Sequence, residues 1–384
     1  MDLTLTEDQE LVQSTAREFL AARSAGADAK AMAGDPLGYS PALWKEMTGL
    51  GWTGLAVPES YGGVGEGFLE LCLLIEEMAR AQVPSPFLTA AACSGMAITR
   101  YGSEEQKREL LGEICRGRVI SYAPEPTGGR TGPAGSAGSA GSGVTASRDG
   151  DGFVLAGSAP FVPYAHAADD LLVVARGGPD GDPEPTTVFL AGAGSPGITR
   201  EQLSVVGTDR MCQVTFDQVR LPGTRVLGGA GQAGAGESAA AAISAYGTAA
   251  TCAAMVGDAQ GVLDATVEYA TQREQFGKPI GSFQAVAHHC ADMAIDVLSS
   301  RLISYEAIWR LSRELDATGE GSVAKSWVSE ACQRVCARGH QVHGAVGFTM
   351  EHKLHWWLRH ATASAMAFGD ARYHTGQVAA SLGL

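Results

Sequence analysis

The stretch "YATQREQFGKPIGSFQAVAHHCADM" at residues 269–293 decides the fold. Both of its halves read as helix, and the Gly-Lys-Pro between them breaks the helical pattern. Arg273, Gln275 and Phe276 stand immediately before that break. We therefore predict two long antiparallel helices, with these three side chains placed at the connection between them.

The chain on either side divides into three parts. Residues 1–117 are predicted to form an N-terminal helical domain, because Thr6 and Ser103 begin capping boxes and Ser40 precedes a proline at a first helical position. Residues 118–226 contain short β-rich runs such as "DLLVVAR" and "TTVFLAG", and "RDGDG" is a hairpin signal.

Residues 227–384 are helical again, with one helix expected to start near Val323. Helices, then strands, then helices predict an α+β fold with segregated layers. The Gly/Ser/Ala tract at 127–147 predicts a surface loop, and it holds no G-x-G-x-x-G between a strand and a helix.

Composition narrows the possible partners and the compartment. The formal net charge of −14 disfavours nucleic acid and anionic membrane surfaces as partners. The acidic start lacks the apolar segment of a signal peptide, and no apolar run is predicted to cross a bilayer. Eight scattered cysteines without a C-x-x-C pair predict a reduced, cytoplasmic location.

Five histidines lie close together in sequence near the C-terminal end, and histidine is a common metal ligand. No cysteine or carboxylate completes a ligand set at a suitable spacing, so we predict no metal. The histidines concerned are His340, His343, His352, His355 and His360.

Four segments resemble signatures of the acyl-CoA dehydrogenase family, in the family's order and at its spacing. The opening stretch is the first of them. The others are "LGWTGLAVPESYGGVG" (50–65), "VTFDQVRLPGTRVLG" (214–228) and "QVHGAVGFTMEHKLHWWLRHA" (341–361). The resemblance implies N-terminal helices, a middle β-domain, a C-terminal four-helix bundle and FAD bound between the last two.

The resemblance also implies a reaction and partners. An acyl thioester lies against the flavin, a carboxylate removes its α-proton, and the β-hydrogen leaves as hydride to flavin N5. Reduced flavin then passes electrons to an electron-transfer acceptor, usually from a homotetramer. The sequence does not say whether the thioester belongs to CoA or to a carrier protein.

The same resemblance carries cofactor roles onto particular residues. Arg273, Gln275 and Phe276 correspond to residues that reach the FAD of a neighbouring subunit, and an arginine fork suits a pyrophosphate. Gln341 and Gly344 match the segment that faces adenosine and pyrophosphate. Phe161 takes the place of a tryptophan over the flavin, and Gly369 is the glycine that follows the usual base position.

Two prolines depart from the family pattern beside the flavin. Pro124 replaces the threonine of a "TEP" segment, and Pro163 replaces a second threonine two residues after Phe161. A proline has no backbone N–H and no side-chain donor, so the flavin is expected to have fewer anchors here.

The catalytic base is the larger departure. The two positions that usually hold it correspond to Phe368 and Gly247. Asp370 is the nearest carboxylate, although the cap of a C-terminal helix explains it equally well. Asp258 and Asp264 have no motif support and are predicted to lie on solvated or interface faces.

Three functions therefore stay open. The chain could be a complete FAD-dependent acyl thioester dehydrogenase with Asp370 or another carboxylate as base. It could instead be a base-less subunit that works with a homologous second chain. It could also be a repurposed family member that does other chemistry in a biosynthetic pathway.

Overall fold

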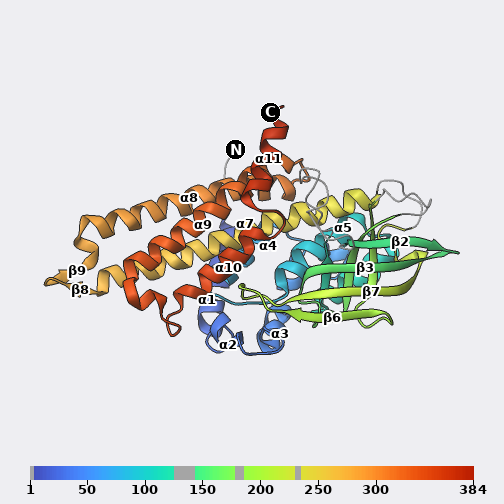
Figure 1. The fold of residues 1–384 in the computed structure, drawn as a ribbon, viewed down its shortest axis with the longest axis horizontal. Helices are drawn as coiled ribbons and strands as arrows, with labels where there is room; N and C mark the ends of the chain where they lie inside the picture. Colours follow the sequence, from blue (N-terminus) through green and yellow to red (C-terminus); the bar gives the residue numbers. More distant parts are fainter. Residues whose placement is uncertain (1–3, 125–142, 178–185, 230–234) are drawn as a thin grey trace, which may run out of the picture.

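The computed structural model describes residues 4–124, 143–177, 186–229 and 235–384. Most of the predicted Gly/Ser/Ala loop lies outside these ranges, and so do Glu125 and Pro126, which precede it. Its last residues were predicted wrongly, because residues 143–147 belong to a strand. The helical, β and helical order expected from the sequence is visible along the chain (Figure 1).

The N-terminal layer is helical, as predicted. Thr6 and Ser103 form complete capping boxes, and Ser40 caps a helix that begins with Pro41. The helices are α1 (Glu7–Arg23), α2 (Ala29–Met32), α3 (Pro41–Gly49), α4 (Phe68–Arg80), a π-helix at Leu88–Gly95, α5 (Met96–Tyr101) and α6 (Glu104–Cys115).

The middle layer is a seven-stranded sheet in the order β1-β4-β2-β3-β7-β6, with β5 paired to β4. Strands β2 and β3 form the predicted hairpin. The edge strand β6 was not predicted, because "ITREQL" lacks an apolar alternation. The strands are β1 (Ile120–Ala123), β2 (Gly143–Asp149), β3 (Gly152–Pro163), β4 (Asp170–Arg176), β5 (Thr186–Gly192), β6 (Ile198–Leu203) and β7 (Met211–Pro222).

The C-terminal layer is a helical bundle that extends away from the sheet (Figure 1). Helix α9 begins five residues before the expected start near Val323. The elements are α7 (Ala235–Gln272), β8 (Glu274–Gln275), β9 (Lys278–Pro279), α8 (Gln284–Ser312), α9 (Thr318–His343), α10 (Leu354–Met366) and α11 (Ala371–Ser381). By length and composition α7 could cross a membrane, but 72% of its apolar window is buried within the protein, as in a core helix.

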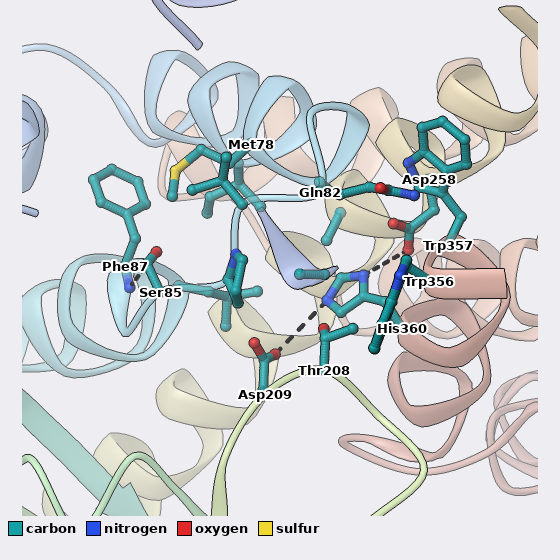
Figure 2. Close-up of a pocket in the computed structure, with 17 residues that line it drawn as sticks. Met78, Gln82, Ser85, Phe87, Thr208, Asp209, Asp258, Trp356, Trp357 and His360 are labelled. Atoms are coloured by element: carbon teal, nitrogen blue, oxygen red, sulfur yellow. Dashed lines mark hydrogen bonds and ion pairs between the residues drawn. The ribbon is translucent and has the colours of Figure 1, made fainter. Parts of the chain in front are cut away.

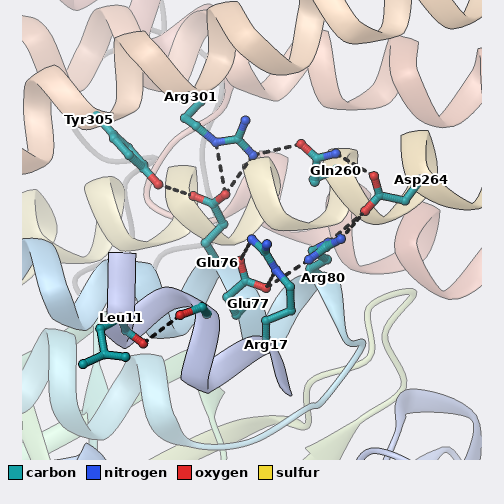
Figure 3. A network of polar contacts seen from close by, with 10 residues as sticks. Leu11, Arg17, Glu76, Glu77, Arg80, Gln260, Asp264, Arg301 and Tyr305 are labelled. Atoms are coloured by element: carbon teal, nitrogen blue, oxygen red, sulfur yellow. Dashed lines mark hydrogen bonds and ion pairs between the residues drawn. The ribbon is translucent and has the colours of Figure 1, made fainter. Parts of the chain in front are cut away.

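A network of charged side chains around two buried glutamates, Glu76 and Glu77, connects α4 to the bundle (Figure 3). Glu76 is 1% exposed and binds Arg301 at 2.9 Å and the hydroxyl of Tyr305 at 2.8 Å. Arg80 bridges Glu77 and Asp264, and Arg17 also binds Glu77. Asp264 therefore lies at a domain interface, as expected. Three carboxylates face three guanidinium groups, so the charges of this network are balanced.

Candidate active site and cofactor site

The break between α7 and α8 is a tight hairpin at the far end of the bundle (Figure 1). Phe276 and Gly277 form its two-residue loop, both with positive φ (56° and 77°), as a type I′ turn requires. The Phe276 side chain is 93% exposed. Arg273 and Gln275 are also exposed, and Arg273 has no ion-pair partner among the described residues.

The end of α9 lies beside this hairpin. The His343 ring stacks on Tyr269 of α7 with centroids 4.5 Å apart. Gly344 ends the helix at φ 62°, and a Cβ built there would meet no atom within 4 Å. Gln341 is exposed one turn earlier. The structure thus brings the predicted adenosine- and pyrophosphate-facing residues to one end of the bundle.

Phe161 lies in a different region, on the sheet. It sits in a bulge of β3, where the pairing with β7 shifts between Ala159 and Val162. Its φ is 57°, which is unusual for a bulky residue, and its side chain is 60% exposed. Phe161 therefore points away from the core of the β-domain and is available to cover a ligand.

The two positions where the family usually holds its base are in contact with each other. A Cβ built on Gly247 would lie 2.1 Å from Cζ of Phe368. The Phe368 ring also stacks on Tyr122 at the end of β1, with centroids 5.4 Å apart and planes at 23°. An aromatic ring therefore fills the space in which a carboxylate would be expected.

A buried lysine forms hydrogen bonds with the backbone of the loop that carries Phe368. Lys325 on α9 is fully buried, and its ammonium group donates to the carbonyl oxygens of Ala365 and Gly369, both at 2.9 Å. Burial lowers the pKa of Lys325 to about 8. His374 lies 3.0 Å from the carbonyl oxygen of Phe368. Sequence reasoning missed Lys325, although a lysine within the apolar ladder of α9 was a signal.

Asp370 acts as the cap of α11. Its carboxylate accepts a hydrogen bond from the backbone N–H of Tyr373 at 2.7 Å. Gly369, at φ 101°, makes the turn before this cap, and a Cβ there would lie 2.4 Å from the Tyr373 ring. A cap is the role that its position before a helix already suggested.

The predicted site residues thus form two groups, which lie near two widely separated positions of α7. Arg273, Gln275, Phe276, Gln341 and Gly344 share the hairpin end of the bundle. Phe161 lies on the sheet, and Gly369 and Asp370 follow the loop that contacts Gly247. Gly247 and Arg273 are 26 residues apart, which is about 39 Å of helix at ~1.5 Å per residue.

A pocket of about 60 Å³ lies between α4, α7, α10 and the loop before β7 (Figure 2). Asp258, predicted to lie on a solvated or interface face, is instead 1% exposed and binds His360 at 2.7 Å. That prediction was wrong because a partner on α10 offsets the burial of the charge. Burial alone would lower the pKa of His360, but Asp258 and Asp209 outweigh it and hold this pKa well above its usual range.

The other histidines named above serve the fold. His340 and His343 each contact a backbone carbonyl of α9 through Nδ1, at 2.8 Å. Among the described residues, no three His, Cys, Asp or Glu side chains lie close enough to hold a metal ion.

The residues at the hairpin end fit the adenosine and pyrophosphate part of FAD. They offer an arginine without an ion-pair partner in the described chain, an exposed aromatic ring and a glycine with open space beside it. An unpaired guanidinium and close backbone approach are what a diphosphate requires.

Comparisons with known proteins match this geometry. Residues 6–118 match the N-terminal domain of the acyl-CoA dehydrogenases, and residues 234–383 match their C-terminal domain. The acyl-CoA dehydrogenase FadE27 of Mycobacterium tuberculosis is 31% identical over 345 residues, which cover 88% of this chain and 86% of that protein.

Solved structures agree over the whole chain. Butyryl-CoA dehydrogenase of Megasphaera elsdenii superposes with a TM-score of 0.87 at 26% identity, covering 100% of both chains. A chain of the ChsE4–ChsE5 complex of Mycobacterium tuberculosis also gives 0.87, at 28% identity, covering 100% of this chain and 99% of that one. The fold expected from the motifs is confirmed, and the chain belongs to the acyl-CoA dehydrogenase family, whose members are oxidoreductases that carry out FAD-dependent acyl dehydrogenation.

Proposed function

We propose that this chain is a subunit of an oligomeric enzyme that dehydrogenates an acyl thioester with FAD shared between subunits. The separation of the two residue groups by about 39 Å of α7 supports this most strongly. A single cofactor would not reach both groups within one chain, whereas two chains could each offer one group. When bound, FAD supplies the acceptor for the β-hydrogen as hydride.

Each group then has its own role. Arg273 donates to the pyrophosphate, while Gln275, Phe276, Gln341 and Gly344 surround the adenosine half. Phe161 covers the isoalloxazine of another cofactor, with Gly369 close to it. The exposed, left-handed Phe276 and Phe161 support these roles, because bulky residues in that conformation are found where a site requires them.

The proton-abstracting base has two possible sources. Asp370 is the carboxylate nearest in sequence to the base position at Phe368, but its oxygen already caps α11. The second source is a homologous chain that brings its own glutamate. The contact between Phe368 and Gly247 favours the second, because an aromatic ring occupies the space between this chain's two usual base positions. The ChsE4–ChsE5 complex is a structural neighbour built from two named chains.

Purification of the chain alone tests the proposal. We expect it to bind FAD, seen as a yellow protein with a flavin spectrum, and to form a homo-oligomer. Anaerobic mixing with acyl-CoA of graded length should leave the flavin oxidised, and co-expression with a glutamate-bearing homologue should restore its reduction. A stable, colourless oligomer that stays inactive with every homologue would instead support a repurposed scaffold.

The remaining assignments belong to the same proposal. A soluble electron-transfer protein would reoxidise the flavin, and the cytoplasm would be its compartment, consistent with eight free cysteines. The thioester carrier, CoA or a carrier protein, is decided by the same assay with both forms of one acyl group.

A further inference from the structure

The hairpin between α7 and α8 carries a second cation beside Arg273. Lys278 on β9 is exposed, and it has no ion-pair partner among the residues that the structure describes. Its ammonium group lies over the ring of Phe283, with Nζ 4.3 Å from the ring centroid. An aromatic ring attracts a cation at this distance but does not neutralise its charge, and the ammonium group keeps its hydrogen-bond donors. Lys278 is therefore a free positive charge within the described chain.

The register of the hairpin shows which residues share a face with this lysine. Gln275 pairs with Lys278 across β8 and β9. The backbone N–H of Ile280 donates to the carbonyl oxygen of Arg273 at 2.8 Å, which continues the pairing by one step. Directly opposite residues lie on the same face of a hairpin, and successive residues alternate between its faces. Arg273, Gln275 and Lys278 therefore share one face. Glu274 lies on the opposite face, away from both cations.

The spacing along this face suits a ligand with two adjacent anionic groups. Lys278 is the diagonal neighbour of Arg273 across the hairpin, and such neighbours are about 7–8 Å apart, within reach of long side chains. A diphosphate bridge carries one negative charge on each of its two phosphates, and Arg273 supplies only one positive charge. A second cation on the same face offsets the other phosphate through a charge-assisted hydrogen bond.

Two phenylalanines restrict the position of the ammonium group. Phe283 is the cap residue of α8, and its ring meets that of Phe276 edge to face with centroids 6.0 Å apart. Phe276 is itself one of the predicted cofactor residues. The contact with Phe283 therefore holds the Lys278 ammonium group close to the hairpin loop. A side chain that is already restrained loses less conformational entropy when it binds a ligand.

The sequence motif did not identify this lysine, because it drew attention to the residues before the break at Gly277. We infer that Lys278 is the second cation that binds the diphosphate of FAD, beside Arg273, on the face of the hairpin that meets a neighbouring subunit. This inference rests on the proposed function and adds a binding residue to it. Two cations at the diphosphate make the affinity for FAD depend on ionic strength, because salt screens exposed charges.

Equilibrium dilution of the FAD-loaded oligomer, with released FAD measured after ultrafiltration, tests the inference. Lys278→Met keeps an unbranched side chain against Phe283 and removes the charge. At low salt its dissociation constant for FAD should be at least about tenfold higher than that of wild type, the effect of one hydrogen bond to a charged group. Raising the salt concentration from about 0.05 to 0.5 M should weaken FAD binding more in wild type than in Lys278→Met.

Two further variants serve as controls. Lys278→Arg keeps the charge and the contact with the aromatic ring, so it should bind FAD like wild type. Lys45→Met removes an exposed lysine of α3 and should change neither the affinity nor its salt dependence.

Two results would overturn the inference and leave the proposed function intact. In the first, Lys278→Met binds FAD as tightly as wild type, although Arg273→Ala binds it more weakly. In the second, Lys278→Met loses the same affinity at both salt concentrations, or Lys278→Arg is as weak as Lys278→Met, because the positive charge then plays no part. Full retention of FAD by Arg273→Ala would instead remove the hairpin from the proposed function, and this inference with it.

Discussion

Two parts of α7, the hairpin end and the turn around Gly247, have opposite surroundings. At the hairpin end, Arg273 and Phe276 are exposed and the space beside Gly344 is open. About a third of the way along α7 from its N-terminus, Gly247 is covered by Phe368, which in turn stacks on Tyr122. The cofactor end is therefore open to a partner, whereas the position of the base is filled from within the chain.

Under the proposed function, α7 keeps the cofactor-binding role of its family and has lost the position of the base. The hairpin end needs only a guanidinium, an aromatic ring and open backbone, and all three are present. The turn around Gly247 needs a carboxylate with room for substrate, and an aromatic ring has taken that room. The variants below change one part at a time.

The largest effect is expected from restoring a carboxylate at the filled position. Phe368→Glu should remove the ring from Gly247 and place an acid near the substrate position. The rate of flavin reduction by acyl-CoA should then rise by roughly 10²–10⁴-fold, the range for general base catalysis. Phe368→Gln has the same shape without the base and serves as the control. Equal rates in both variants would show that steric relief alone, and not the missing base, limits the reaction.

The pH dependence of stability should reveal the lysine that holds the same loop. The pKa of Lys325 is about 8 in the folded chain and 10.5 as its ordinary value. The unfolded state therefore binds more protons between these values, and the unfolding free energy should rise as pH increases from about 8 to 10.5. This stability is present above pH 10.5 and is lost as pH falls through about 8.

The rise should amount to at most about 3.5 kcal/mol, at about 1.4 kcal/mol for each pH unit. Urea unfolding of wild type and Lys325→Met at several pH values measures it as the difference between the two profiles. If the unfolding free energies of the two proteins change in parallel with pH, the pKa of Lys325 is the same in the folded and unfolded chain, and the prediction is wrong.

The open end is tested by removing its arginine. Arg273→Ala should weaken FAD binding by about 1.5–3 kcal/mol, the value of a hydrogen bond to a charged group, measured by fluorescence titration of the apoprotein. Arg313→Ala changes an arginine just beyond the far end of α8 and should leave the affinity unchanged. If both variants retain FAD equally, the hairpin does not bind the cofactor.

The smallest effect is expected where a single methyl group meets the ring. Gly247→Ala places a Cβ against Phe368 and should lower the unfolding free energy by about 1–3 kcal/mol through overpacking. Gly321→Ala in α9 meets no atom within 4 Å and should be neutral or slightly stabilising. The double variant Gly247→Ala/Phe368→Ala should not show the overpacking cost. Persistence of that cost would mean the helix itself requires glycine.

The parts of the fold that the sequence predicted depend on local chemistry. Capping boxes at Thr6 and Ser103, the break at Gly277–Pro279 and the hairpin at Gly150 are set by residues close in sequence. Strand β6 depends on pairing with β7 across the sheet, and its polar residues gave no periodic signal. Pairing between strands that are distant in sequence leaves no signal in the local pattern of apolar and polar residues.

The candidate site divides in the same way. The proposed cofactor residues at the hairpin were predicted from a contiguous motif, and the two positions that lack the usual base were predicted from their spacing to family motifs. The contact of Gly247 with Phe368, and the pairing of Asp258 with His360, join residues about a hundred positions apart. Burial of Asp258 could not be predicted, because only the fold supplies the imidazole that makes it tolerable.

The central claim is that this chain holds FAD with a neighbour but does not supply the base from either usual position. Stopped-flow absorbance of the purified, FAD-loaded chain after anaerobic mixing with acyl-CoA tests it most directly. The account predicts that the flavin absorbance of wild type stays constant, while Phe368→Glu or a glutamate-bearing homologous partner makes it bleach. Rapid bleaching by wild type alone, abolished in Asp370→Asn, would contradict the account and identify Asp370 as the base.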